Sequence, residues 1–422
     1  MIRTTQRLAP VLGMVLCALL SMTAAMISPA RSGAVTASSC VPARPTSCTL
    51  RELATLNGIR IGATAEASET TDADHAGTLV REFDSVTPEN AMKWYATQAD
   101  PGVWTFTDAD TVVAHAAAHD MEVRGHTLVW AQDSYTPAWV RAISDPAVLR
   151  AAVETQITTT MNHFRGSVHR WDVVNEPLAS LGTGRSTSVF WSLGDDWIAE
   201  AFALAHSIDP TAELWLNEYG SDWVPGKHEA LVALVRELID RGVPIDGVGL
   251  QTHRLPGDPL DAARFTAQLT DFTSLGLQVA ITELDVPVSP TDPDAFARQA
   301  VEYGAITAAC LSVRGCAEIT IWGVSDGSTW LDALGVFPTP TRPLLFDTAF
   351  QPKPAYEAVR AALAAPLVAA SPVVDTSPPT SSPEILPITG AETTAAATVA
   401  FLLIGLGLLL RRSAGHRMRP SD

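Results

Sequence analysis

The sequence repeats one pattern eight times between about residues 48 and 364: a short apolar run ends in polar or aromatic residues, and a helical stretch follows. The eight runs are IRIGATAE (59–66), FDSVTPEN (83–90), EVRGHTLVW (122–130), HRWDVVNEP (169–177), ELWLNEYG (213–220), DGVGLQTH (246–253), QVAITELD (278–285) and EITIWGVSD (318–326). Helix-like segments between them include 147–163, 227–240, 262–275 and 294–311. Short apolar strands that alternate with helices predict a parallel sheet covered by helices.

The number of these units favours a closed barrel. Eight strand–helix units in one stretch of this length are typical of the α/β class and of its (β/α)8 TIM barrel. The alternative is an open, doubly wound sheet, but no glycine-rich phosphate loop follows the first strand. We therefore predict a single barrel domain over residues 48–364. A hydrophobic content of 47% is sufficient for its core.

Two of the runs carry a glutamate near their end. Glu176 follows WDVVN (171–175), and Glu283 follows VAIT (279–282). Barrel enzymes build their sites at the carboxyl ends of the strands, where the fourth and seventh strands face each other across the mouth. Cleavage of a glycosidic bond needs one carboxyl group to protonate the leaving oxygen and another to attack carbon or activate water. We expect these two glutamates to meet at one ligand, although a single glutamate is more often a helix cap or an ion-pair partner.

Other side chains at the strand ends fit this chemistry. Asn175 is placed to bind a sugar hydroxyl, and His253 and Asp285 are placed to orient and charge-balance the second carboxylate. Three tryptophans offer flat apolar faces for sugar rings, with core packing as the alternative: Trp130, Trp322 and Trp330. The pattern requires no metal ion and no cofactor. A net charge of −18 argues against nucleic acid as a partner.

The first 37 residues resemble an export signal. Arg3 and Arg7 precede an apolar stretch (8–26), and small residues follow up to position 37. A membrane anchor is the alternative, but the stretch is short and is interrupted by Pro10 and Gly13.

Removal of this signal leaves four cysteines: Cys40, Cys48, Cys310 and Cys316. An even number in an exported chain favours disulfides over a metal site. Four cysteines allow three pairings, and proximity in the sequence favours Cys40 with Cys48 and Cys310 with Cys316.

The end of the sequence has a different composition. Residues 365–385 include the Pro/Ser/Thr-rich stretch SPVVDTSPPTSSP, which predicts an extended linker. LPITG (386–390), an apolar run (391–410) and a basic tail to residue 422 then follow in that order. About 20 apolar residues can span a bilayer, and basic residues beyond them hold that end in the cytoplasm.

This order resembles the cell-wall sorting signal of Gram-positive surface proteins. The resemblance implies that a sortase cuts between Thr389 and Gly390 and joins Thr389 to peptidoglycan. A plain tail anchor is the alternative. The expected location is therefore the outside of a Gram-positive cell, with the precursor held by one membrane span.

Over nearly all of residues 50–362 the chain is similar to glycoside hydrolase family 10, the β-1,4-xylanases. The stretches that carry this similarity are VTPENAMKW (86–94), RGHTLVW (124–130), WDVVNEP (171–177), GVGLQTH (247–253), ITELD (281–285), CAEITIWGVSD (316–326) and PLLFDTAFQPKPAY (343–356). The resemblance implies an endo-acting enzyme on xylan or xylo-oligosaccharides, which we expect to be a monomer.

The resemblance also implies a role for each matching residue. Glu176 matches the acid/base and Glu283 the nucleophile of a retaining double displacement, with the two carboxyl groups about 5–5.5 Å apart. An apolar wall and the charge of Glu283 are expected to raise the pKa of Glu176. Asn175 matches the residue that binds the sugar 2-hydroxyl, and Asp285 the partner of His253. The other residues matching the substrate-binding positions are Glu89, Asn90, Lys93, His126, Trp130, Gln251, His253, Trp322 and Trp330. The Cys310–Cys316 pair fits a disulfide common in the family.

One segment departs from the family pattern. The family usually has His-x-Gln and Pro-x-Trp after a tryptophan, whereas this chain reads WAQDSYTPAW (130–139). Ala131 stands at the histidine position, and about two extra residues precede Pro137. The usual histidine contact is therefore not expected, and Gln132 is the one candidate to replace it.

Two other functions are open to a chain of this kind. A related barrel glycosidase acting on cellulose or mannan is one, although in the family the tryptophan matching Trp330 crowds the site of the hydroxymethyl group that xylose lacks. A surface adhesin with an inactive site is the other, but that function predicts the loss of a carboxylate, and both are present.

Overall fold

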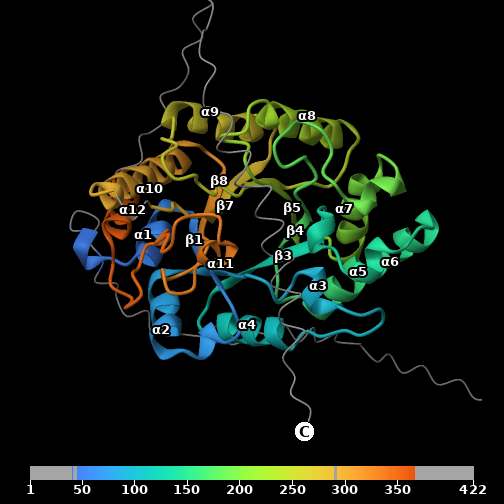
Figure 1. The fold of residues 1–422 in the computed structure, drawn as a ribbon, viewed down its shortest axis with the longest axis horizontal. Coiled ribbons are helices and arrows are strands. Elements are labelled where there is room, and N and C mark those ends of the chain that lie inside the picture. Colours follow the sequence, from blue (N-terminus) through green and yellow to red (C-terminus); the bar gives the residue numbers. More distant parts are fainter. Residues whose placement is uncertain (1–39, 41–44, 289–291, 366–422) are drawn as a thin grey trace, which may run out of the picture. The chain divides into compact units, whose positions relative to one another are not determined.

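Eight parallel strands close into a barrel in the structure, a computed structural model that describes residue 40, residues 45–288 and residues 292–365 (Figure 1). The strands are β1 (Arg60–Ala65), β2 (Ser85–Pro88), β3 (Glu122–Trp130), β4 (Arg170–Asn175), β5 (Glu213–Glu218), β6 (Gly247–Leu250), β7 (Gln278–Leu284) and β8 (Cys316–Ile321). Each strand pairs with the next, and β8 pairs with β1. The predicted barrel is confirmed, and the open sheet is wrong.

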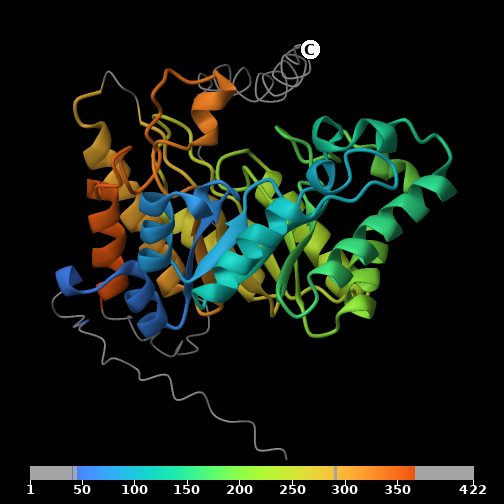
Figure 2. The ribbon, with the colours of Figure 1, turned by 90° about the horizontal axis from the view of Figure 1, so that it is seen from below.

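Helices connect the strands and cover the outside of the barrel (Figures 1 and 2). They are α1 (Leu50–Asn57), α2 (Ala73–Glu82), α3 (Trp94–Thr97), α4 (Thr107–Ala118), α5 (Ala138–Arg141), α6 (Pro146–His163), α7 (Trp197–Ile208), α8 (Lys227–Asp240), α9 (Ala262–Thr273), α10 (Ala295–Ser312), α11 (Trp330–Leu334) and α12 (Pro354–Ala364). The predicted helix over residues 227–240 has the bounds of α8. The other three predicted helices differ from α6 and α9 by one or two residues at one end, and from α10 by one residue at each end.

The strands are buried on both faces because helices cover the outside and side chains fill the inside. Ile61, Val173 and Leu216 are fully buried, and β4 and β5 are buried along all but their first residue. This explains why the strands read as nearly continuous apolar runs without a polar face.

The inside of the barrel also holds a charged cluster that the sequence did not predict. Arg124 donates to Asp172 (Nε to Oδ2, 3.1 Å), and Arg170 donates to Glu318 (Nη1 to Oε2, 2.6 Å). Both guanidinium groups lie about 5 Å from the centre of the Trp215 ring. Each buried charge in this cluster therefore has an opposite charge beside it, which offsets the desolvation of the ions.

The four predicted disulfide cysteines pair as expected. Cys40 bonds Cys48 with an S–S distance of 2.08 Å, and Cys310 bonds Cys316 with an S–S distance of 1.97 Å. The second bridge joins the last turn of α10 to the first residue of β8.

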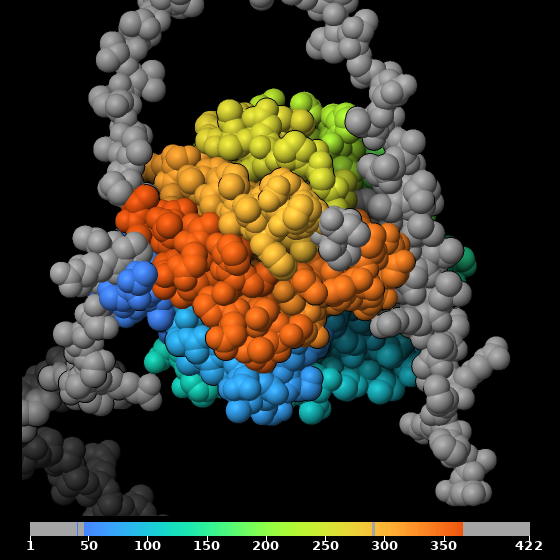
Figure 3. All heavy atoms as spheres, turned by 60° about the vertical axis from the view of Figure 1, so that its left-hand side comes forward, coloured from blue at the N-terminus to red at the C-terminus, as the bar shows by residue number. Residues whose placement is uncertain are grey.

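The last helix packs beside the first. Figure 3 shows α12 (red) between the N-terminal surface (blue) and the surface of α10 (orange-yellow). Asn57, at the end of α1, donates to the Leu363 carbonyl (2.6 Å), and the Tyr356 hydroxyl donates to Glu82 (3.0 Å). Because Asn57 comes just before β1, the end of α12 lies at the amino ends of the strands.

Several predictions fall outside the described residues. These are the export signal (1–37), the linker from residue 366 onward, and the sorting signal (386–422) with its apolar run. Among the helices that the structure describes, none has the length and apolar character needed to cross a membrane.

Candidate active site

Glu176 and Glu283 both open into one cleft at the carboxyl ends of the strands. Glu176 directly follows β4 and has a left-handed backbone, with φ of 57°. Glu283 belongs to β7. The cleft has a volume of about 330 Å³. Its lining includes all twelve predicted catalytic and substrate-binding residues, together with Tyr95, Gln132, Ser134, Tyr135, Ser180, Tyr219, Ala333 and Leu334.

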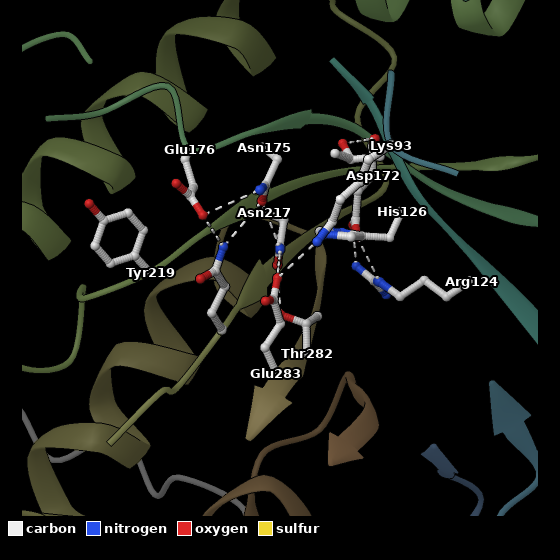
Figure 4. Close-up of polar contacts among 12 residues, drawn as sticks. Lys93, Arg124, His126, Asp172, Asn175, Glu176, Asn217, Tyr219, Thr282 and Glu283 are labelled. Atoms are coloured by element: carbon white, nitrogen blue, oxygen red, sulfur yellow. Dashed lines mark hydrogen bonds and ion pairs between the residues drawn. The ribbon is translucent and has the colours of Figure 1, made fainter. Parts of the chain in front are cut away.

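Three side-chain amides link the two carboxyl groups (Figure 4). Gln251 donates to Glu176 Oε1 (2.9 Å), and Asn217 donates to Glu283 Oε1 (2.6 Å). The side-chain oxygen of Asn175 (Oδ1) accepts from both amides, at 2.9 Å from Asn217 and 3.2 Å from Gln251. The orientation of each carboxyl group is therefore coupled to that of the other.

Asn217 was not among the predicted site residues, although it lies in a predicted strand. Its amide oxygen accepts from the Thr282 hydroxyl (2.6 Å), which fixes the direction of its NH2 group. A Cβ atom at Gly249, on the neighbouring strand β6, would overlap the Asn217 amide. Glycine at position 249 thus leaves the space that this amide occupies.

His253 stands between Glu283 and Asp285. Its Nε2 lies 3.1 Å from Glu283 Oε2, and its Nδ1 lies 2.9 Å from Asp285 Oδ2. Burial alone would lower the pKa of His253, but Asp285 and Glu283 outweigh burial and raise it to about 10. Asp285 also accepts from the Trp330 indole N–H (2.7 Å), so the predicted pairing of Asp285 with His253 is present and also holds one cleft wall.

Glu283 is surrounded by positive or proton-donating groups. Burial raises the pKa of its carboxyl, but the His253 hydrogen bond and the charges of His126, His253 and Lys93 together bring that pKa below its ordinary value. His126 Nε2 lies 4.0 Å from Glu283, and its Nδ1 lies 2.9 Å from Asp172. Glu283 is therefore kept ionised.

Glu176 has the opposite character. Burial raises the pKa of its carboxyl, and the negative Glu283 raises it further. The Gln251 hydrogen bond, the indole N–H of Trp130 and the charge of Lys227 oppose this rise without cancelling it. One cleft thus holds a carboxyl whose pKa is raised beside one whose pKa is lowered, an arrangement that separates acid and base roles.

A second polar group lies at the ends of β2 and β1. Lys93 donates to Asn90 Oδ1 (3.3 Å), and the Tyr95 hydroxyl donates to the same oxygen (2.6 Å). The Asn90 NH2 group contacts Glu66, which follows β1. Burial raises the pKa of Glu89 to about 8. Tyr95 and Glu66 were not predicted as site residues.

The departing segment gives Trp130 an unexpected environment. The Tyr135 ring stacks on Trp130 with centroids 3.6 Å apart and planes 4° apart, and Lys93 Nζ lies over the Trp130 ring at 4.8 Å. Trp130 therefore contacts one aromatic ring and one ammonium of the site while it also lines the cleft. Trp130 lines the cleft with Trp322 and Trp330, and its contact with a sugar ring stays a prediction.

The rest of this segment is fixed by backbone contacts. Asp133 donates its N–H to the Thr187 carbonyl (2.9 Å), and its side chain accepts from the Val189 N–H (2.7 Å). Ala131, which stands at the histidine position of the family, is fully buried. Gln132, the candidate to replace the histidine contact, lines the cleft.

Trp322 and Trp330 remain in the cleft wall beside the histidines. The Trp322 ring lies 5.4 Å from His126 edge-on, and the Trp330 ring lies 4.9 Å from His253. Within the part of the chain that the structure describes, no group of acidic, histidine or cysteine side chains is arranged to hold a metal ion.

The barrel and its paired carboxyl groups define the class of barrel glycosidases. Residues 49–362 match the family described as Glycosyl hydrolase family 10, and the chain belongs to that family.

Related proteins cover most of the chain. "Endo-1,4-beta-xylanase 3" of Hypocrea jecorina is 37% identical over 286 residues, which are 68% of this chain and 77% of the relative. Xylanase 10B of Thermotoga maritima has a similar structure, with a TM-score of 0.70, 35% identity, and coverage of 75% of this chain and 98% of that one. Xylanase 10B of Thermotoga petrophila, solved with xylobiose, gives a TM-score of 0.70, 34% identity, and coverage of 75% and 97%.

Proposed function

We propose that this protein hydrolyses internal β-1,4-xylosidic bonds by a retaining double displacement, with Glu176 as acid/base and Glu283 as nucleophile. The enzyme is an endo-1,4-β-xylanase of family 10, as its relatives are, and xylan or xylo-oligosaccharides are its substrates. The observation that carries the mechanism is one cleft in which burial and neighbouring charges set the pKa values of two carboxyl groups apart.

The first step forms a covalent intermediate. Glu283 attacks the anomeric carbon while Glu176 gives its proton to the glycosidic oxygen, so that the bond breaks and the leaving chain departs as an alcohol. His253 and Lys93 hold Glu283 ionised for this attack. The Asn175 side-chain oxygen accepts two hydrogen bonds, and its NH2 group donates to Glu176 Oε1 (3.3 Å). Asn175 thus stands beside the acid/base, where it is proposed to bind the sugar 2-hydroxyl.

The second step releases the sugar. Glu176 is now ionised and removes a proton from a water molecule, whose oxygen attacks the anomeric carbon and frees Glu283. Two inversions at one carbon give net retention. Glu176 therefore acts first as an acid and then as a base, which requires a pKa that responds to the charge of Glu283.

Product stereochemistry tests this mechanism directly. Proton NMR of xylan digests at early times should show the β-anomer of the new reducing ends before mutarotation. Early appearance of the α-anomer would mean inversion and would contradict the mechanism. Comparison of turnover on purified xylan and on carboxymethylcellulose tests the substrate class, and faster cleavage of cellulose would count against it.

Replacement of the nucleophile is the matching mutational test. Glu283→Ala should abolish hydrolysis of xylan and of aryl xylosides alike, because both need the covalent step. Initial rates on both substrates measure this effect, and a thermal unfolding curve controls for folding. Substantial activity on either substrate would remove Glu283 from its role.

We also propose that the enzyme is displayed on the cell wall of a Gram-positive organism, through cleavage between Thr389 and Gly390 by a sortase. The sequence order of sorting motif, apolar run and basic tail supports this proposal. Truncation after Pro383 should release active enzyme into the medium, whereas the full chain should fractionate with peptidoglycan. Equal release of both forms would contradict wall attachment.

A further inference from the structure

A buried ion pair lies beside the cleft on the side of Tyr219, and the mechanism above does not use it. Lys227 Nζ lies 3.0 Å from Glu218 Oε1, and both side chains are fully buried. The same ammonium lies 3.7 Å from the centre of the Tyr219 ring. Tyr219 in turn lines the cleft beside Glu176 (Figure 4).

Local forces do not explain a lysine at this position. Lys227 is the first residue of α8, and the amino end of a helix disfavours a positive charge. Full burial of an ammonium and of a carboxylate is also unfavourable unless their geometry is good. A position that breaks local rules in this way is a candidate for a functional role.

Glu218 holds the backbone that carries Glu176. One oxygen of Glu218 accepts from the Leu178 N–H (2.9 Å), and the other accepts from the Tyr219 N–H (3.0 Å). The Glu176 N–H donates to the Asn217 carbonyl (2.9 Å). The end of β5 therefore fixes residues 176–178 at both ends of the turn in which Glu176 has its left-handed φ of 57°.

Both charges of the pair also act on Glu176. The Lys227 ammonium lowers the pKa of Glu176, whereas Glu218 and Glu176 repel each other when both are ionised. Burial and this repulsion raise the pKa of Glu218 to about 7 in spite of Lys227. The titratable and charged groups that face Glu176 are Glu283, Lys93, Lys227, Glu218, Tyr135 and Tyr219.

We propose that Glu218 and Lys227 are a positioning pair that holds the acid/base turn and balances the charge beside it, and so sets the alkaline limit of activity. This inference rests on the proposed role of Glu176 as proton donor. The pair touches no reacting atom and acts through Glu176. Its two members have opposite effects, because each leaves the other charge unopposed when it is removed.

Two neutralising variants with opposite expected signs test the pair. Glu218→Gln leaves Lys227 unopposed, so the alkaline limb of kcat/KM on xylan should move to lower pH. Activity at one pH unit above the wild-type limb should then fall on the order of tenfold relative to wild type. Lys227→Met should move the same limb to higher pH, and the double variant should return it toward the wild-type position.

An aryl xylobioside with a dinitrophenyl leaving group separates positioning from general damage. Its kcat/KM does not need the proton of Glu176, so neither single variant should shift its alkaline limb. The buried pair of Lys353 and Asp326 is the matched control, since it has an N–O distance of 2.9 Å and Asp326 accepts the Leu344 N–H. Asp326→Asn and Lys353→Met should lower the unfolding temperature without moving either limb.

The outcomes are distinguishable. Limbs that do not move, or that move in the same direction in both single variants, would overturn the inference while leaving the proposed function intact. If neither single variant folds but the double variant does, the pair is only a structural charge balance, and the inference also fails. Wild-type xylan hydrolysis should show an alkaline limb that is absent in Glu176→Ala. If the wild type has no such limb, or if Glu176→Ala keeps it, the proposed role of Glu176 is itself wrong.

Discussion

At the scale of single residues, two identical side chains differ in chemistry because their neighbours differ. Glu176 accepts from neutral amides and is buried beside Tyr135 and Trp130, so its pKa is raised. Glu283 accepts from Asn217 and a protonated His253, so its pKa is lowered. The acidic limb of activity should follow Glu283, which must lose its proton. The alkaline limb should follow Glu176, which must keep its own.

Glu176→Ala should divide substrates by leaving group. Proton donation contributes about 10²–10⁴-fold to such reactions. We expect a loss of this size in kcat/KM on xylan and a much smaller loss on a dinitrophenyl xylobioside, whose leaving group needs no proton. Equal losses on both substrates would exclude Glu176 as the acid.

Tyr135 is the residue through which the departing segment acts on the site. Tyr135→Ala removes the ring stacked on Trp130, and such contacts contribute about 0.5–1.5 kcal/mol. We expect kcat/KM on linear xylo-oligosaccharides to fall about 2- to 10-fold as Trp130 loses its fixed position. Tyr135→Phe keeps the ring and should retain most of the activity. A loss of equal size in both variants would point to the hydroxyl group instead.

At the scale of elements, the ends of the strands could be predicted from the sequence, but the contacts between side chains of different strands and loops could not. Short apolar runs predicted all eight strands, and their polar ends predicted cleft residues at the ends of β4, β6 and β7. The cleft residues that follow β2 were expected only from the resemblance to family 10. Asn217 and Tyr219 stand at such an end too, in ELWLNEYG, and the same reasoning applied to β5 would have found them. Tyr135 lies in a segment whose length differs from the family pattern, so its stacking depends on a backbone path that no periodicity encodes.

The charged cluster inside the barrel could not be predicted from the sequence either. Arg124, Asp172 and Glu318 lie on three different strands, and each belongs to a run that reads as apolar overall. Their contact depends on the register between strands, in which Arg124 stands opposite Arg170 and Ala280 opposite Glu318. Register is set by the whole closed sheet, so local pattern alone does not give it.

Neutralising this cluster should weaken the whole barrel. Asp172→Asn leaves the buried Arg124 without its main partner, and breaking a buried pair in this way costs about 3–5 kcal/mol. Urea unfolding measures the loss. Asp196→Asn is the matched control, because its ion pair with Arg241 lies at the surface and should contribute less than about 1 kcal/mol. Losses of similar size would show that the interior charges are not specially important.

At the scale of the whole molecule, a buried carboxyl in the cleft lowers the free energy of unfolding as the pH rises. Glu89 is a half-buried carboxyl of the cleft whose pKa burial raises from 4.5 to about 8. A carboxyl with a raised folded pKa favours the fold while it is protonated, and that contribution is lost as the pH rises through its folded pKa. The folded enzyme therefore loses stability between about pH 4.5 and pH 8 through this group.

Glu89→Gln should reverse that loss while weakening the enzyme's grip on its substrate. We expect its free energy of unfolding, relative to wild type, to increase between pH 5 and pH 9 by on the order of 1 kcal/mol. KM for xylan should rise in the same variant. The exposed Glu229→Gln provides the control. If the free energy of unfolding changes with pH in the same way in wild type and in Glu89→Gln, the raised pKa of Glu89 is ruled out.

The hydrogen bond from Asn57 to the Leu363 carbonyl has a geometric consequence for any attachment. It places the end of α12 at the amino ends of the strands, which is the opposite end of the barrel from the cleft. Under the proposed wall attachment, the enzyme would therefore be joined to the wall through the end of the barrel that lies farthest from its cleft.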